Sequence, residues 1–274
     1  MRLPASGGGS GLRVRSLASG SNGNCTLVAT EEAAILIDAG ISARAILAGL
    51  AATGVAEGAV RAILLTHEHS DHTRGLAAVA RRLGAVVIAN EATLRCVGGE
   101  APPFATRVLG TGDELTAFGI RVRSFPLSHD AADPVGYLLE AGGRRVGCAT
   151  DTGVAGDLAQ HLRGLDLAIV EANHDEERLL AGPYPWALKR RILGERGHLS
   201  NATAAALVAE LLETSPATEV WLAHLSATNN SPALALNTVC RHLGAAADRV
   251  SLAPRGQPGP VWNGAARFRQ LTLF

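Results

Sequence analysis

Three histidines and an aspartate stand within six residues, in the stretch Thr66-His-Glu-His-Ser-Asp-His72. An apolar run at residues 62–65 precedes this cluster, and residues 73–83 follow it with helical spacing of apolar positions. The cluster is therefore predicted at a strand-to-helix junction, where regular elements hold side chains rigidly. Imidazole nitrogen with carboxylate oxygen, and without cysteine, is a ligand set that suits zinc, manganese or iron. A solvated loop gives no reason for such density, so the chain is predicted to fold around a metal site.

The spacing inside the cluster indicates where its ligands point. Alternate residues of an extended turn face the same side, so His67 and His69 are expected to share one point. Asp71 and His72 enter the helix and turn towards a neighbouring point. The stretch can therefore serve two adjacent metal ions.

Three later segments repeat the pattern of an apolar strand that ends in a metal-competent side chain. These side chains are His129, Asp151 and His224. Each also has an ordinary interpretation, as a loop histidine, a helix cap and a core histidine respectively. For any one of them taken alone, the ordinary interpretation is preferred.

The rest of the chain is typical of a globular protein of two sheets covered by helices. It has 274 residues, of which 47% are hydrophobic and 18% charged, and this length supports a large core. Strands are predicted throughout both halves with helices between them, which favours an α/β fold with two sheets over one parallel sheet. The expected strands are residues 13–18, 25–29, 33–37, 62–65, 85–89, 120–125, 135–140, 145–149, 167–170 and 219–223, and helices are expected from residue 42 and at 73–83, 202–213 and 232–243. We expect a flexible tail at residues 1–11 and one domain over residues 12–274.

Composition narrows the classes of function. The apolar runs are far shorter than the roughly 20 residues of a membrane span, and the N-terminus lacks the apolar core of a secretory signal. Four widely spaced cysteines argue against a disulfide framework, so a cytoplasmic location is expected. The 25 basic and 25 acidic residues give a net charge of zero, which gives no support for broad nucleic-acid affinity but leaves room for a local basic patch.

With these residues in place, the chain resembles the metallo-β-lactamase superfamily, whose HxHxDH signature stands here as His67-Glu-His-Ser-Asp-His72. The resemblance implies an αββα sandwich with a site for two divalent metal ions, zinc or manganese, with iron as a further option. It implies that one ion is bound by His67, His69 and His129, the other by Asp71, His72 and His224, and that Asp151 bridges them. Two such ions activate a hydroxide for hydrolysis.

Finer motifs bear on the substrate. Glu171 follows an apolar strand and His198 precedes a helix, which is similar to the glutamate and histidine of the tRNA 3′-processing endonucleases and related phosphodiesterases. A histidine oriented by a carboxylate can protonate the alkoxide that phosphodiester cleavage expels. The alternatives are a loop histidine and a surface acid. His174, beside this pair, has no predicted role.

The segment Gly182–Ile192 interleaves aromatic rings with cations. Aromatic faces can stack on bases while cations contact phosphates, but a helix that packs Trp186 and Leu188 inward beneath a solvated basic face explains the pattern equally well. The turn at residues 19–24 is interpreted as a tight hairpin rather than an anion-binding nest. The candidate substrate-binding residues are Tyr184, Trp186, Lys189, Arg190, Arg191, Asn201, Asn229 and Asn230.

Several of these motifs together are similar to the WalJ (YycJ) branch of the superfamily, which is linked with DNA 5′-exonuclease activity. The resemblance implies a phosphodiesterase that takes DNA as substrate and degrades it in the 5′-to-3′ direction with metal-activated hydroxide. The alternative is a small-molecule hydrolase acting on a thioester, a lactone or a cyclic phosphodiester. A module with purely structural metals is disfavoured, because all seven ligands are intact.

Overall fold

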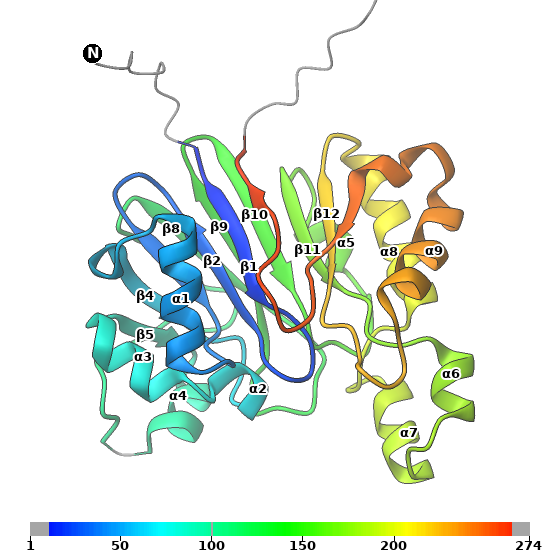
Figure 1. Ribbon diagram of the computed structural model, residues 1–274, viewed down its shortest axis with the longest axis horizontal. Coiled ribbons are helices and arrows are strands. Elements are labelled where there is room, and N and C mark those ends of the chain that lie inside the picture. Colours follow the sequence, from blue (N-terminus) through cyan, green and yellow to red (C-terminus); the bar gives the residue numbers. More distant parts are fainter. Residues whose placement is uncertain (1–10, 100, 265–274) are drawn as a thin grey trace, which may run out of the picture.

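Two seven-stranded sheets face each other in the computed structural model, which describes residues 11–99 and 101–264 (Figure 1). Apart from Gly11, the predicted tail at residues 1–11 lies outside the described residues. No helix among the described residues is both long and apolar enough to cross a membrane.

The first sheet is built from the N-terminal part of the chain, closed at one edge by a strand from near the C-terminus. The β1–β2–β3 part is antiparallel and the β3–β4–β5–β6 part is parallel. In spatial order its strands are β14 (Val261–Trp262), β1 (Arg13–Ala18), β2 (Cys25–Ala29), β3 (Ala34–Ile37), β4 (Val60–Leu64), β5 (Val86–Ala89) and β6 (Thr106–Val108).

The second sheet comes from the C-terminal part. Its first strands along the chain pair antiparallel, and the β10–β11–β12–β13 part is parallel. In spatial order its strands are β13 (Val250–Leu252), β12 (Glu219–Ala223), β11 (Leu167–Glu171), β10 (Arg144–Ala149), β9 (Val135–Ala141), β8 (Ile120–Pro126) and β7 (Glu114–Ala117).

Helices cover the outer face of each sheet, so the predicted αββα sandwich is confirmed (Figure 1). The first sheet is accompanied by α1 (Ala43–Thr53), α2 (Ser70–Thr73), α3 (Leu76–Leu83) and α4 (Glu91–Gly98). The helices between the later strands of the second sheet are α5 (Leu158–His161), α6 (Glu176–Ala181), α7 (Trp186–Leu193), α8 (Asn201–Thr214) and α9 (Pro232–Leu243). Helices α6 and α7 project from one end of the sandwich, where the chain leaves β11.

The alternation of side chains along β4 explains why an apolar run forms a strand here. Ala62 and Leu64 belong to the cluster between the two sheets, whereas Ile63 and Leu65 belong to the cluster beneath α1 and α3. Successive side chains of a strand point to opposite faces, so a strand buried on both faces needs apolar residues throughout. Leu65 ends this run, and the polar cluster begins at the next residue.

The helix predicted at residues 73–83 is instead divided into α2 and α3 at Arg74 and Gly75. A Cβ atom on Gly75 would lie 2.1 Å from the carbonyl oxygen of Ile41, and the Gly75 amide donates to the carbonyl of Ala39 at 2.8 Å. The close approach of the loop after β3 therefore ends α2. Periodicity alone gave no sign of this contact.

Candidate metal centre

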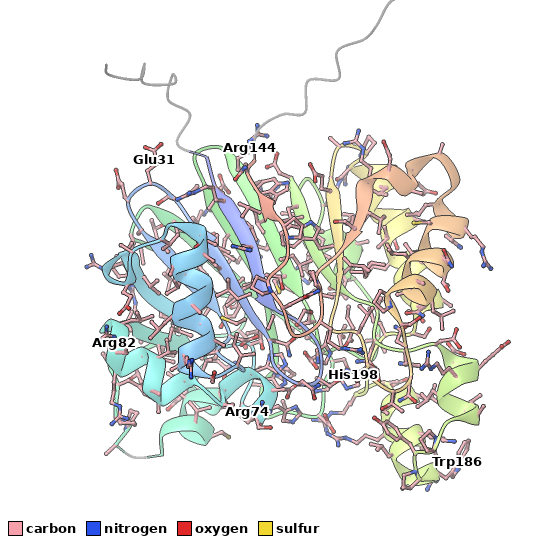
Figure 2. All side chains as sticks on the ribbon, viewed as in Figure 1. Glu31, Arg74, Arg82, Arg144, Trp186 and His198 are labelled. Carbon is pink, nitrogen blue, oxygen red and sulfur yellow. The ribbon has the colours of Figure 1, made fainter. Side chains whose placement is uncertain are left out.

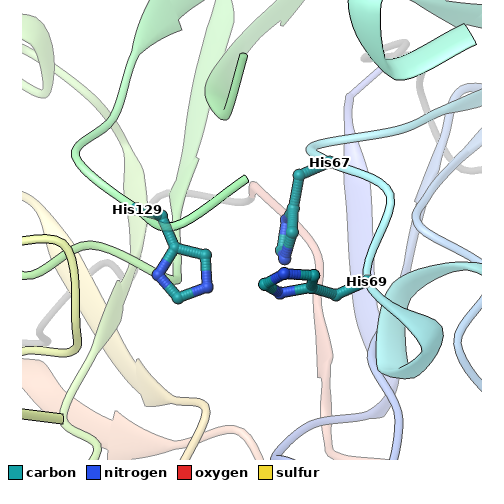
Figure 3. A group of neighbouring side chains, drawn as sticks. All are labelled: His67, His69 and His129. Atoms are coloured by element: carbon teal, nitrogen blue, oxygen red, sulfur yellow. The ribbon is translucent and has the colours of Figure 1, made fainter. Parts of the chain in front are cut away.

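Every predicted ligand comes from one end of the sandwich. His67 and its neighbours follow β4, His129 follows β8, Asp151 follows β10 and His224 follows β12. Figure 3 shows His67 and His69 on one segment and His129 on another, with their rings converging. Strands packed in two sheets thus bring residues that are far apart in the sequence to one point.

The seven predicted ligands form overlapping groups. Within each group the candidate ligand atoms lie within 4.8 Å of one another. Asp151 lies between the others: its carboxylate oxygens are 3.1 Å from His72 Nε2 and 3.9 Å from His129 Nε2. On the second side, Asp71 Oδ2 lies 3.4 Å from His224 Nε2 and 3.6 Å from His72 Nε2. The groups are His67 with His69 and His129, His67 with His72 and Asp151, Asp71 with His72 and His224, and Asp151 with Glu171, His198 and His224.

Each of four buried imidazoles is held through its Nδ1 atom. His72 Nδ1 lies 2.7 Å from Asp38 Oδ2, and His224 Nδ1 lies 2.7 Å from Glu171 Oε1. His129 Nδ1 lies 3.0 Å from the carbonyl oxygen of Gly197, and His67 Nδ1 lies 3.0 Å from the hydroxyl of Thr66. Anchoring one ring nitrogen fixes the ring and leaves Nε2 as the ligand atom, which is the usual arrangement around metal ions.

The buried polar atoms of this cluster fit a divalent metal ion. His67 Nε2 is buried and has no hydrogen-bond partner among the described residues, although buried polar atoms normally have one. Burial and the neighbouring His72 hold the pKa of His67 well below its ordinary value, so His67 is neutral and able to ligate. Burial likewise lowers the pKa of His129. An ion bound at this point would supply the missing partner.

The carboxylates of the cluster are ionised despite their burial. Burial alone would raise the pKa of Asp151, but His224 and His72 outweigh it and hold the pKa well below its ordinary value. Asp151 in turn raises the pKa of His224 to about 10 against the effect of burial. The same balance, led by Asp38 and Asp151, raises the pKa of His72. A metal ion would therefore displace protons from these histidines when it binds.

Glu171 joins the metal cluster to His198. Its Oε1 atom lies 2.8 Å from His198 Nδ1 and 2.7 Å from His224 Nδ1, and its side chain is fully buried. Its Oε2 atom accepts the backbone amides of Thr152 and Leu199, both at 3.1 Å. Burial alone would raise the pKa of Glu171, but His198 and the hydrogen bonds outweigh it and lower the pKa to about 2. One ionised carboxylate thus orients two histidines.

His198 carries a proton more readily than an ordinary histidine. Burial would lower its pKa, but the Glu171 carboxylate raises it above the ordinary value. Its ring centroid lies 5.0 Å from that of His129 and 5.4 Å from that of His224. This imidazole therefore stands beside the metal cluster with its protonated form favoured by Glu171, which suits it to donate a proton to a substrate.

Backbone strain is concentrated at this end of the sandwich. Asp38, Asp151 and His224 adopt positive φ angles of 61°, 64° and 53°. Residues other than glycine rarely adopt these angles, and such strain clusters at functional sites. The only other described residue of this kind is Phe118, in the turn between β7 and β8.

The turn at residues 19–24 is a hairpin, as predicted, and it also supports the metal cluster. It joins the antiparallel strands β1 and β2. The hydroxyl of Ser19 accepts the backbone amide of His224 at 2.8 Å, and Asn24 Nδ2 lies 3.0 Å from His72 Nε2. Asn24 also donates its backbone amide to the carbonyl of Asp71 at 2.8 Å. The turn therefore holds parts of both ligand segments.

A cavity of about 250 Å³ opens beside the cluster and is lined on one side by residues of α7. Tyr184 and Arg191 line this cavity, as two of the predicted substrate-binding residues. Trp186 and Arg190 do not line it, and the Trp186 side chain is 58% exposed. Figure 2 shows Trp186 at the outer end of α7, far from His198. Trp186 therefore neither lines the cavity, as base stacking at the site would require, nor packs inward, as the alternative required.

Four further candidates are turned into the protein rather than towards substrate. Lys189 is buried, and its Nζ donates to the carbonyls of Leu180 at 2.6 Å and Gly182 at 2.8 Å, so it joins α6 to α7 instead of facing phosphate. Asn201 and Asn230 are buried and bond to each other at 2.8 and 3.1 Å. Asn229 is also buried. A substrate-binding role does not fit these placements, because no face of the side chains is open to the cavity.

Sequence reasoning missed the residues that hold the ligands. Asp38 and Thr66 hold His72 by hydrogen bonds to its Nδ1 atom. The Thr66 hydroxyl also forms a hydrogen bond with His67 Nδ1. Gly197 acts through its carbonyl, which no side-chain pattern can reveal. Asp38 could have been recognised from the sequence, because it is an acidic residue that follows the buried strand β3, just as Asp151 follows β10. His174 is fully buried beside Asn173, and burial lowers its pKa.

Comparison with known proteins agrees with this geometry. Residues 33–225 match a family model described as "Beta-lactamase superfamily domain". The chain is 40% identical over 237 residues to exodeoxyribonuclease YycJ of Bacillus anthracis, covering 85% of this chain and 89% of that protein. It is 36% identical over 239 residues to exodeoxyribonuclease WalJ of Streptococcus pneumoniae, covering 85% and 88%.

A solved structure supports the fold independently. The metallo-β-lactamase fold protein YhfI from Bacillus subtilis superposes with a TM-score of 0.72 over 93% of this chain and all of that one. The two sequences are 17% identical, so this similarity concerns the fold alone.

Proposed function

The chain belongs to the metallo-β-lactamase superfamily and is a metal-dependent hydrolase, and from that premise we propose that it cleaves phosphodiester bonds in DNA as a 5′-to-3′ exonuclease. The relatives named exodeoxyribonucleases support DNA as the substrate. The observation that carries the proposal is the buried Glu171, which holds both His198 and the ligand His224. This contact couples an acid to the metal cluster.

Two divalent ions, zinc or manganese, are proposed at the cluster. His67, His69 and His129 would hold one, Asp71, His72 and His224 would hold the other, and Asp151 would contact both. When bound, such ions lower the pKa of water and stabilise negative charge on the phosphate. Imidazole nitrogens together with buried carboxylate oxygens, and without cysteine, support this donor set.

His198 is proposed as the general acid. Its Nδ1 is engaged by Glu171, so Nε2 remains to face the leaving group. Cleavage of a phosphodiester in DNA expels a nucleoside alkoxide, which is a poor leaving group unless it receives a proton. The raised pKa of His198 favours the protonated form that donates this proton. The backbone amides of Thr152 and Leu199 donate to Glu171 and hold its carboxylate beside His198.

The alternative is a small-molecule hydrolase for thioesters, lactones or cyclic phosphodiesters. A thiolate is a good leaving group and needs no acid, so the Glu171–His198 pair would have no role on a thioester. Lactones and cyclic phosphodiesters expel alkoxides, as DNA does, so against these two substrates the preference for DNA is supported by the relatives named exodeoxyribonucleases.

The proposal is tested by comparing substrate classes with one preparation. Initial rates are measured on a DNA oligonucleotide, a thioester, a lactone and a cyclic phosphodiester, first with manganese and then with zinc. The proposal expects the oligonucleotide to be the preferred substrate by kcat/KM. Preference for any of the three small molecules, in protein with full metal content, would select the alternative.

A further inference from the structure

Helix α7 presents two different sides to its surroundings. Leu188 and Arg191 line the cavity, whereas Trp186 and Arg190, four residues apart, share the other side. Lys189 is buried between α6 and α7. Arg191 is therefore the cation that α7 brings to the cavity.

The Arg191 guanidinium is oriented by a carboxylate next to the metal cluster. Its Nε atom donates a hydrogen bond to Asp130 Oδ2, and Asp130 Oδ1 lies 3.3 Å from His129 Nε2. The two Nη atoms of Arg191 have no hydrogen-bond partner among the described residues. Asp130 is the residue next to His129 in the loop after β8, so its backbone is held in place together with that of the candidate ligand. The guanidinium fork is thus fixed at one edge and free at the other.

Arg191 is much more exposed to solvent than the candidate metal ligands that line the same cavity. Side chains of the ligands His129 and Asp151 are 2% and 3% exposed, at the floor of the cavity, whereas the side chain of Arg191 is 58% exposed, at its mouth. The Asp130 carboxylate, 28% exposed, lies between them. A strand whose scissile phosphate reached the floor would leave the cavity through its mouth, where Arg191 can meet the next phosphate.

We infer that Arg191, oriented by Asp130, binds the phosphate that neighbours the scissile one, and this inference rests on the proposed function. A planar guanidinium with two free Nη groups suits bidentate contact with phosphate oxygens. The site therefore selects substrates with at least two consecutive phosphates over a single phosphodiester. Arg191 is a substrate-binding residue, and Asp130 is a positioning residue that acts through it.

The experiment compares Arg191→Gln with Arg190→Gln, the matched control on the same helix. Each is assayed on the p-nitrophenyl ester of thymidine 5′-phosphate, which has one phosphate, and on a single-stranded DNA oligonucleotide. Arg191→Gln is expected to raise KM for the oligonucleotide about 10- to 100-fold, the range of a lost charged hydrogen bond, and to leave the ester unchanged. Arg190→Gln is expected to match wild type on both, with equal metal content in all three proteins.

The salt dependence gives a second readout that a packing defect would not change. Loss of one phosphate contact to a single strand should reduce the slope of log KM against log salt by about 0.7 in Arg191→Gln. Arg191→Lys, which keeps the charge but not the fork, should restore the slope and only part of the KM.

Two results would overturn the inference while leaving the proposed function in place. Equal losses on the ester and the oligonucleotide would put Arg191 at the scissile phosphate or in the fold, and no loss on either would remove it from substrate binding. Absence of oligonucleotide cleavage by the metal-replete wild type would instead refute the proposed function, and this inference with it.

Discussion

Replacement of Glu171 by glutamine separates the contribution of charge from that of shape. The carboxylate accepts four hydrogen bonds, two from imidazole Nδ1 atoms and two from backbone amides, and it is fully buried. Glutamine has a single acceptor oxygen, and its NH₂ group must face two of those donors. Two buried N–H groups then lack an acceptor, at about 1–3 kcal/mol each, so we expect a loss of roughly 2–6 kcal/mol in the free energy of unfolding.

The same substitution should weaken both functions that the carboxylate connects. Loss of the partner of His224 should lower metal affinity about 10- to 100-fold, as for other groups that orient metal ligands. Loss of the partner of His198 should lower kcat on DNA by about 10²- to 10⁴-fold when metal is saturating. Urea unfolding, metal titration and initial rates measure the three effects separately.

Glu213→Gln provides the matched control. Glu213 is exposed near the end of α8, and no candidate ligand is a near neighbour of it in the sequence. It should change none of the three quantities. A Glu171→Gln protein with wild-type stability and wild-type metal affinity would refute the reasoning that one carboxylate holds both histidines.

Four other perturbations have defined outcomes. His198→Ala should keep its metal content and lose about 10²- to 10⁴-fold in kcat on DNA, with p-nitrophenyl phosphodiesters less affected because p-nitrophenolate leaves without a proton; equal losses would remove His198 from the acid role. Asp151→Ala should lose metal, measured by elemental analysis, and hydrolysis with it; retention of both would exclude it as a ligand. Dialysis against EDTA should lower the melting temperature and added manganese should restore it, because the ion binds the folded state; an unchanged temperature contradicts this. Tyr137→Phe removes the buried 2.7 Å hydrogen bond to the Leu65 carbonyl and should cost about 1–3 kcal/mol in urea unfolding, and a neutral effect would count against that contact.

Four of the seven candidate metal ligands could be grouped from the sequence because their spacing is local, and the other three entered through the resemblance to the superfamily. His67 to His72 lie in one short segment, and the later candidates each follow an apolar strand that periodicity identifies. The two sheets and their covering helices followed from the same periodicity. Short elements such as β6, β13 and α5 were missed, because three or four residues give no measurable period.

The orientation of side chains around the ligands could not be predicted in the same way. Lys189, Arg190 and Arg191 are consecutive in the sequence, yet they face the protein interior, solvent and the cavity respectively. Their directions depend on where α7 begins and on which side packs, and the alternative that packed Trp186 inward does not hold, because Trp186 is 58% exposed. Glu171 was predicted to hold His198, but its contact with His224 requires β11 and β12 to be neighbours in register.

The most direct test of the central claim is hydrolysis of a 5′-phosphorylated DNA duplex, labelled at either end, by the purified protein with manganese, beside Asp151→Ala from the same procedure. The account predicts that the wild type alone releases labelled mononucleotides from the 5′ end at early times, while the 3′ label remains in long fragments. Release from the 3′ end first would contradict the proposed polarity. No release from either end by metal-replete wild type, or equal release by Asp151→Ala, would contradict the claim that this metal cluster hydrolyses DNA.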